Sequence, residues 1–170
     1  MEFKPFVRDV PDFPHAGVLF KDITPLLDNA QAFSRAIDAM AEPALALHPT
    51  HVLGLESRGF IFGSALAHKL GIGFAPARKP GKLPMPTYHA TYASEYGEDS
   101  MHIHQDAFGP GDRVLIVDDV LATGGTAGAA REIIERTGAH PVALTLFIEL
   151  AFLKGRERLK GLPVFSVLTY

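Results

Sequence analysis

Residues 114–130 read VLIVDDVLATGGTAGAA, and this stretch decides the fold. Four apolar residues lead into two consecutive carboxylates, Asp118 and Asp119, and a glycine-rich run, Ala122 to Thr126, then opens a helical pattern. A short run of Val, Leu and Ile with a helix close behind is typical of a βαβ unit in a buried parallel sheet. The stretch therefore predicts a buried strand, an acidic turn at its carboxyl end, and a helix.

The same alternation recurs along the chain. HVLGLE is expected to be a strand, and it precedes a helical pattern that stops at Gly71, where a helix-ending glycine belongs. Three more apolar runs predict strands, at residues 72–78, 141–150 and 164–170. Strands that alternate with helices predict an α/β protein, with a central, mostly parallel sheet flanked by helices.

Two regions fall outside this alternation. Residues 1–29 are rich in proline and predict an N-terminal hood ahead of a helix that begins near Asn29 and that Pro43 ends or kinks. Residues 80–105 alternate Tyr, Thr and His, which is typical of a polar β-hairpin and makes this segment a candidate lid. No linker divides the sequence, so residues 1–170 are expected to form one domain.

The composition excludes several classes of protein. The chain has 16 basic and 19 acidic residues, a net charge of -3, no cysteine and no apolar run of about 18 residues. Its overall field does not favour nucleic acid or anionic membranes, and disulfides and thiolate metal sites are excluded. We expect a cytoplasmic protein without nucleic-acid or membrane partners, and a solvated surface for the basic run at residues 153–161.

The glycine-rich run Ala122, Thr123, Gly124, Gly125, Thr126 is a candidate phosphate cradle. Its glycines allow successive N–H groups to converge beside the positive end of a helix dipole, and its two hydroxyls are additional donors. No lysine follows the glycines, which excludes a Walker A loop.

Asp118 and Asp119 suggest what else the ligand carries. Carboxylates repel phosphate, so an acid pair beside a cradle fits a ligand that also presents hydroxyls, or a bridging cation. A phosphorylated pentose with Mg²⁺ meets both requirements. The alternative is that the acids only cap the turn, but the coincidence of strand, acid pair and cradle within a dozen residues favours a binding site.

The stretch VLIVDDVLATGGT resembles the phosphoribosyl-diphosphate (PRPP) signature of the type I phosphoribosyltransferases. Four further segments are similar to the members of this family that act on adenine: PDFPHAGVLFKDITP (11–25), GLESRGFIFG (54–63), RKPGKLP (78–84) and YASEYG (92–97). The resemblance implies a type I phosphoribosyltransferase fold and a homodimer. It also implies a purine-salvage transferase that converts adenine and PRPP to AMP and pyrophosphate with Mg²⁺.

Two alternatives stay open: an enzyme for hypoxanthine or guanine, and a PRPP-sensing regulator without catalytic activity. The regulator would need a DNA-binding element, and residues 1–29 are too short and too broken by proline for a helix-turn-helix.

The turn that contains Ser57 and Arg58 can face an anion at the same sheet edge as the cradle, and the resemblance implies that it receives pyrophosphate. Glu56 is expected either to turn away or to orient Arg58. Three more cations could neutralise the leaving group: Arg78, Lys79 and Lys82. The resemblance implies that Mg²⁺ is held mainly by PRPP, near Asp118 and Asp119 and without a direct protein metal site.

For the base, Phe20 and Lys21 provide an aromatic face and a cationic stem that can cover a flat purine. The resemblance implies base recognition by backbone groups of Leu19 and Lys21. It also implies that Glu95, next to Tyr96 in the hairpin turn, shares a proton with the attacking nitrogen. The family usually has Arg in place of Lys21 and a basic residue in place of Pro80.

Overall fold

The computed structural model describes residues 2–94 and 97–170. The chain divides into two compact units, Met1–Ala39 and Met40–Tyr170. Within the described residues, no helix has the length and apolar character that crossing a bilayer requires.

The first unit holds the short elements of the N-terminal segment. A 3₁₀ turn, η1 (Lys4–Phe6), precedes strands β1 (Arg8–Pro11) and β2 (Leu19–Asp22), which pair antiparallel. Helix α1 (Thr24–Asp28) follows. The sequence predicted an N-terminal hood here but not this strand pair, because prolines mask the short alternating pattern of its strands.

Helix α2 (Ala30–Leu45) begins where the sequence predicted. The Asn29 side chain accepts a hydrogen bond from the Ala32 N–H at 2.9 Å, as an N-cap does. Of the two predicted effects of Pro43, ending the helix is wrong, because the helix continues to Leu45. Met40, Ala41 and Ala44 in its last turns are fully buried, and their packing holds the helix beyond the proline.

The second unit is built on a five-stranded parallel sheet in the order β4-β3-β7-β8-β9. Its strands are β3 (His51–Leu55), β4 (Gly73–Ala77), β7 (Arg113–Leu121), β8 (His140–Glu149) and β9 (Val164–Thr169). Strands β7 and β8 are buried along most of their length, as continuous Val, Leu and Ile runs require. The predicted α/β class and the predicted strands are confirmed.

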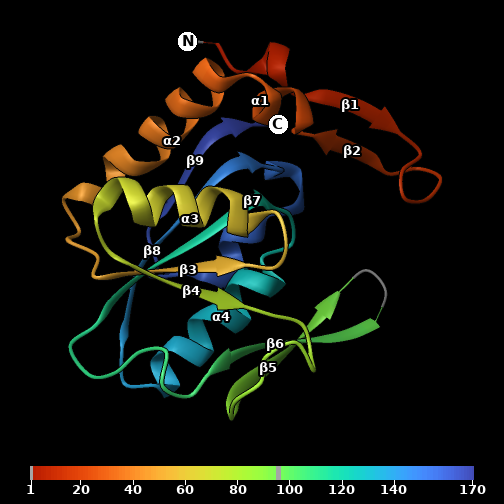
Figure 1. Cartoon of the computed structure of the whole chain (residues 1–170). Helices are drawn as coiled ribbons and strands as arrows, with labels where there is room; N and C mark the ends of the chain where they lie inside the picture. The colour runs from red at the N-terminus through yellow and green to blue at the C-terminus, as the bar shows by residue number, and fades with distance from the viewer. Residues whose placement is uncertain (1, 95–96) are drawn as a thin grey trace. The chain divides into compact units, whose positions relative to one another are not determined.

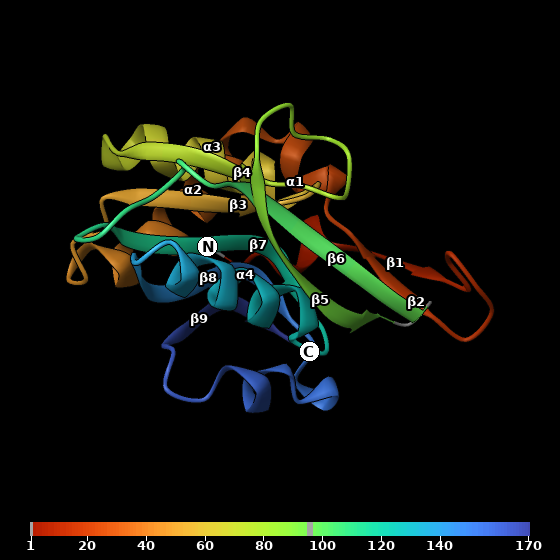
Figure 2. The same ribbon diagram turned by 90° about the horizontal axis from the view of Figure 1, so that it is seen from below.

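Helices α3 (Gly59–Leu70) and α4 (Gly125–Arg136) cover opposite faces of this sheet, as Figure 1 and Figure 2 show together. Gly71 ends α3 with φ +67°, which is the helix-ending role that the sequence predicted for it. The large side chains of Phe62, Leu66, Ile133 and Ile134 on these helices are fully buried.

The chain adds strands to the sheet in opposite directions on the two sides of the β3–β7 pair. The chain passes from β3 to β4 on one side, and from β7 through β8 to β9 on the other. In open α/β sheets the carboxyl ends of strands at such a switch point form the crevice where ligands bind. The loops after β3 and β7 are therefore expected to form the ligand-binding site.

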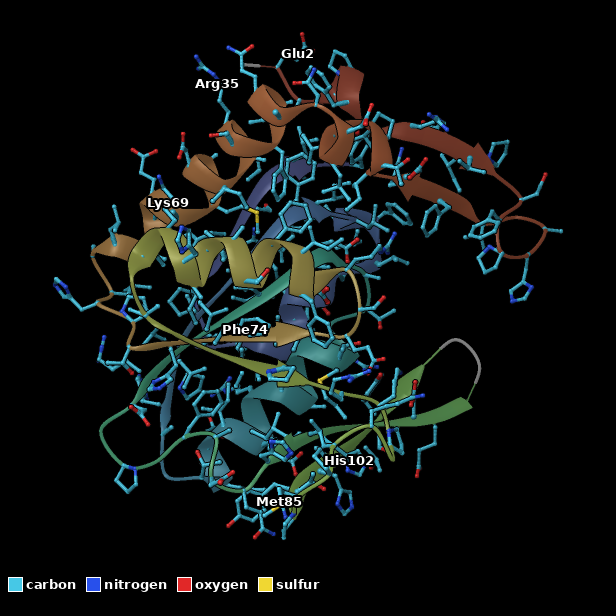
Figure 3. All side chains as sticks on the ribbon, viewed as in Figure 1. Glu2, Arg35, Lys69, Phe74, Met85 and His102 are labelled. Atoms are coloured by element: carbon cyan, nitrogen blue, oxygen red, sulfur yellow. The ribbon has the colours of Figure 1, made fainter. Side chains whose placement is uncertain are left out.

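The predicted hairpin is present as β5 (Thr87–Ser94) and β6 (Gly97–His104), which pair antiparallel and contact α4. Tyr88 and Tyr92 of β5 pack against the hydrophobic core. The hairpin also joins the chain after β4, because Arg78 and His102 exchange two backbone hydrogen bonds of 2.8 Å. His102 is labelled in Figure 3.

Between β8 and β9 the chain forms two 3₁₀ turns, η2 (Ala151–Leu153) and η3 (Gly155–Leu159). This segment contains most of the basic run for which the sequence indicated only a solvated surface.

Candidate active site

The cradle residues lie where β7 ends and α4 begins. Gly124 occupies the N-cap position of α4 with φ +79°, a conformation that favours glycine. The N–H groups of residues 123–126 donate to no other residue in the described part of the chain. A helix start with several free N–H groups attracts anions, since the helix dipole is positive at that end.

A cavity of about 80 Å³ opens at this loop. Its lining contains all five predicted cradle residues, Ala122, Thr123, Gly124, Gly125 and Thr126, together with Asp118. The volume is far below the roughly 300 Å³ at which pockets for whole small molecules begin, and it suits a single phosphoryl-sized group. The structure thus brings the cradle and the first carboxylate to one small cavity.

Asp118 and Asp119 lie on β7 itself, because the strand continues beyond them to Leu121. Asp118 Oδ1 accepts a hydrogen bond of 2.9 Å from the Asp119 N–H. The Asp119 carboxylate is 4% exposed, and its Oδ2 lies 2.8 Å from Arg58 Nε. This ion pair balances charge but lacks hydrogen-bond geometry, so Oδ2 is a buried oxygen with no hydrogen bond from the described residues.

Both carboxyl groups are harder to ionise in the fold than in water, and burial is the main cause for each. Burial, followed by the neighbouring Asp119 charge, raises the pKa of Asp118 well above its usual value. Burial also raises the pKa of Asp119, although the Arg58 guanidinium opposes that shift. A ligand that donates hydroxyl hydrogens or brings positive charge would relieve both effects.

Arg58 reaches Asp119 because two neighbouring strands end side by side. β3 pairs with β7, and the turn 56–58 leads from β3 into α3 with Arg58 at the N-cap. Gly59 permits the close approach, since a Cβ there would lie 2.8 Å from the Val117 carbonyl oxygen and 3.0 Å from Asp118 Oδ1. Ser57 lies in the same turn.

Glu56 neither turns away nor orients Arg58. Its carboxylate accepts hydrogen bonds from Arg78 at 3.1 and 3.4 Å and from the Lys79 N–H at 2.7 Å. These bonds lower the pKa of Glu56, with the Arg78 hydrogen bond as the main cause. Glu56 therefore holds the chain that leaves β4, a role that the sequence did not indicate.

Lys79 is also paired. Its ammonium group donates to the Asp99 carboxylate and, at 2.8 Å, to the Tyr92 hydroxyl. Burial alone would lower the pKa of Lys79, but these two hydrogen bonds outweigh it and raise the pKa. Lys82 is exposed and has no partner in the described part of the chain. Sequence reasoning missed Asp99, whose polar hairpin position gives no local signal of this contact.

The geometry can be compared with known proteins. Residues 24–162 match the model of the phosphoribosyl transferase domain. The chain belongs to the phosphoribosyltransferase family. It is 52% identical over 170 residues to an adenine phosphoribosyltransferase of Carboxydothermus hydrogenoformans, with 100% of both chains covered. A Thermotoga protein with the same name is 50% identical, again with both chains fully covered.

Solved structures of the family agree with this assignment. The adenine phosphoribosyltransferase of Rhodothermus marinus superposes with a TM-score of 0.95 at 50% identity, covering 99% of this chain and 96% of the other. The Saccharomyces cerevisiae enzyme, solved with adenine and an imino-altritol bisphosphate, gives a TM-score of 0.92 at 44% identity over 98% and 96%. The recognition of the fold from the sequence is confirmed.

In this phosphoribosyltransferase, the residues predicted to cover the base lie on β2 of the first unit. Lys21 Nζ is 2.6 Å from Asp9 Oδ1, across the β1–β2 pair. The Phe20 ring meets Phe13 edge-on with centroids 5.1 Å apart, and Leu19 is half exposed. The two hairpin-turn predictions, Glu95 and Tyr96, lie outside the described residues.

Proposed function

We propose that this chain transfers the 5-phosphoribosyl group of PRPP to adenine, giving AMP and pyrophosphate. The observation that carries the proposal is the phosphoryl-sized cavity with four unpartnered N–H groups, beside a buried carboxylate oxygen that lacks a hydrogen bond. PRPP carries a 5′-phosphate, two ribose hydroxyls and a diphosphate. The 5′-phosphate matches the cavity at the loop after β7, and the two ribose hydroxyls match the acid pair near the end of β7.

The assignments for PRPP follow from this match. The 5′-phosphate takes the N–H groups and hydroxyls of residues 122–126. The ribose hydroxyls donate to Asp118 and Asp119, and Asp119 Oδ2 is available to accept one of them. Each donation favours the ionised carboxyl, which burial disfavours.

The diphosphate is assigned to the turn after β3 and to the chain after β4. Ser57 and Arg58 belong to the first segment, and Arg78, Lys79 and Lys82 to the second. Glu56 joins the two segments through Arg78, which supports a shared anion site. Lys82 is exposed, whereas Arg58, Arg78 and Lys79 are part-buried, so Lys82 is the cation best placed for a first contact.

The reaction breaks the bond between ribose C1 and the diphosphate oxygen, whose electron pair leaves with pyrophosphate. Positive charge develops on the ribose, and adenine N9 forms the new bond to C1 while its proton passes to Glu95. Catalysis is then mostly positioning and electrostatic stabilisation of the leaving group by Arg58, Arg78 and Lys82. Closure of the hairpin over the site would keep water from C1.

Mg²⁺ belongs to the proposal. Among the described residues, no three His, Cys, Asp or Glu side chains are grouped to hold a metal. The unbonded Asp119 oxygen beside Asp118 nonetheless fits a cation carried in by the substrate. When bound, Mg²⁺ would neutralise charge on the diphosphate and favour its departure.

The base is assigned to the first unit, with Phe20 and Lys21 against the purine face and backbone groups of Leu19 and Lys21 on its edge. We also include in the proposal a single phosphoribosyltransferase domain over residues 1–170. Residues 1–29 are its hood and residues 80–105 its lid. A homodimer and a cytoplasmic location complete it, and sedimentation and cell fractionation test these two points.

The deciding experiment is a base panel. Purified protein is incubated with PRPP, Mg²⁺ and adenine, hypoxanthine or guanine, and nucleotide and pyrophosphate are quantified. We expect AMP and pyrophosphate in equal amounts with adenine, and at least about a hundredfold lower turnover with the other bases. A preference for hypoxanthine or guanine would overturn the base assignment, and no product with any base would overturn the transferase.

A further inference from the structure

The segment between β8 and β9 contacts the cradle loop from outside the cavity. Gly155 is buried, and a Cβ on it would collide with the Ala122 carbonyl oxygen. A Cβ on Gly124 would collide with the Gly155 carbonyl oxygen in turn. Gly155 is not part of the cavity lining, so it supports the loop rather than binding its ligand.

A hydrogen bond strengthens this contact. The Leu150 N–H donates to the Leu121 carbonyl oxygen at 3.0 Å, directly before the cradle begins. Leu121, which precedes the cradle, and Ala122 and Gly124 within it therefore contact the same short segment.

The position of Gly155 depends on its neighbour Arg156. The Arg156 guanidinium makes two bonds of 2.6 Å to the two oxygens of Glu149, the last residue of β8. It also donates to the Val164 carbonyl oxygen at 2.7 Å and to Ser166 Oγ at 3.3 Å, both on β9. Arg156 is thus attached to two strands of the sheet.

Glu149 is built to hold this arginine. Its side chain is 8% exposed, and Ser166 Oγ donates a third hydrogen bond of 2.8 Å to it. A buried carboxylate with three donors is a rigid anchor, because its alternative positions would leave charge unpaired. The sheet, through Glu149 and Arg156, fixes the backbone on which the cradle rests.

We propose that Glu149 and Arg156 are positioning residues for the 5′-phosphate cradle, acting through the contact of Gly155 with Gly124 and Ala122. The proposal rests on the assignment of the cradle to the 5′-phosphate. Neither side chain touches substrate. Their effect is to keep the N–H groups of residues 123–126 convergent, so that binding a phosphate does not require ordering the loop.

The test separates the two ends of PRPP. Binding of ribose 5-phosphate and of pyrophosphate is measured by calorimetry for the wild type and for R156M, together with the KM values for PRPP and adenine. We expect R156M to weaken ribose 5-phosphate binding and to raise the KM for PRPP about tenfold, with pyrophosphate binding and the KM for adenine within about twofold. R156K, which restores a cation, is expected to recover part of the loss.

Two further variants keep the test decisive. E149Q combined with R156M removes both partners and leaves no buried carboxylate unpaired, so it is expected to fold and still to bind ribose 5-phosphate weakly. R131M is the matched control. It removes an arginine that pairs with Glu135 at 2.9 Å and donates to the Lys160 carbonyl oxygen but does not contact the cradle. We expect wild-type binding of both ligands by R131M.

Equal weakening of ribose 5-phosphate and pyrophosphate by R156M, or wild-type ribose 5-phosphate binding by the folded double variant, would overturn the positioning role. Failure of the wild type to bind ribose 5-phosphate would instead overturn the cradle assignment, and with it the proposed function. The two failures are therefore distinguishable in one set of titrations.

Discussion

The carboxyl edge of the parallel sheet and the β5–β6 hairpin both carry residues that the sequence assigned to the reaction, and they differ in how those residues are paired. At the sheet edge, four N–H groups and a buried carboxylate oxygen have no hydrogen-bond partner among the described residues. At the hairpin, Lys79 is bound by Asp99 and Tyr92. Arg78, which leads toward the hairpin, is bound by Glu56.

This difference separates a preformed site from one that must exchange partners. The free N–H groups of the cradle are ready for a phosphate without rearrangement, and Asp119 Oδ2, although ion-paired with Arg58, can still accept a hydrogen bond. A paired lysine reaches an anion only after leaving its carboxylate. We therefore expect an order of contacts. The ribose 5-phosphate part of PRPP binds first at the sheet edge, and its diphosphate then binds the cations next to the hairpin.

The largest effect is expected from the acid pair. D118N combined with D119N keeps the shape of both side chains but removes both negative charges and replaces one acceptor oxygen on each by an NH₂ donor, and we expect kcat to fall about 10²–10³-fold. The melting temperature should stay the same or rise, because the fold no longer buries two adjacent carboxylates with raised pKa values. D106N, at an exposed aspartate, is the control. A kcat near that of the wild type would show that the sheet edge does not hold the ribose.

A smaller effect tests partner exchange at the hairpin. D99N frees Lys79 from its carboxylate, and we expect pyrophosphate to bind about two- to fivefold more tightly, the equivalent of about 0.5–1 kcal/mol for a part-exposed ion pair. Calorimetric titration measures the change. E98Q is the matched control, since Glu98 precedes Asp99 on the same strand and is exposed. Weaker binding by D99N would mean that Asp99 positions Lys79 for the anion and does not compete with it.

The same contrast explains what the sequence could reveal. The acid pair and the cradle lie within nine residues, directly after an apolar strand, so their proximity is local and visible in the sequence. Gly71 was equally clear, because a glycine after a helical pattern has a local conformational reason.

The pairs that hold the site in place depend on distant residues. Glu56 and Arg78 are 22 positions apart, and Lys79 and Asp99 are 20 apart. Each meets its partner only because of strand order and hairpin register, which no local pattern encodes. Arg156 is the clearest case: in a run of basic residues it suggests solvation, whereas the structure gives it a carboxylate at the end of β8.

The Glu56–Arg78 pair links the sheet edge to the chain that leads toward the hairpin, and its contribution to stability is expected to depend on pH. E56Q removes the charge that holds Arg78, and we expect a loss of roughly 1–2 kcal/mol, or about 2–8 °C in melting temperature, at pH 7. Because the folded pKa of Glu56 is lowered from 4.5, its stabilisation is complete above that value and is lost as pH falls through the folded pKa. Wild type and E56Q should therefore begin to converge as pH falls below 4.5, and should be alike once pH is below the folded pKa of Glu56. A difference that is the same at pH 7 and at pH 4 would mean that the ion pair does not stabilise the fold.

The smallest effect is expected within the hairpin, from a pair of histidines. His89 and His102 are opposite each other in the β5–β6 register, and their rings stack with centroids 5.1 Å apart. Burial, followed by the His89 charge, lowers the pKa of His102 below 6.5, so the fold favours the neutral ring. The unfolded chain then binds the proton more readily, and stability is lost as pH falls below about 6.5.

Hydrogen exchange of the β5 and β6 amides measures this local effect. We expect exchange, relative to the intrinsic rate, to accelerate as pH falls from 7.5 to 5.5. The global melting temperature should change by only about 1 °C. H102Q should remove the acceleration, because glutamine does not titrate. H68Q, at an exposed histidine on α3, should retain it. Arg78 shares two backbone hydrogen bonds with His102. Faster exchange that extends to the Arg78 amide would therefore show that opening of the hairpin also affects the proposed anion site. The same pH dependence in H102Q and in wild type would exclude the histidine pair as its cause.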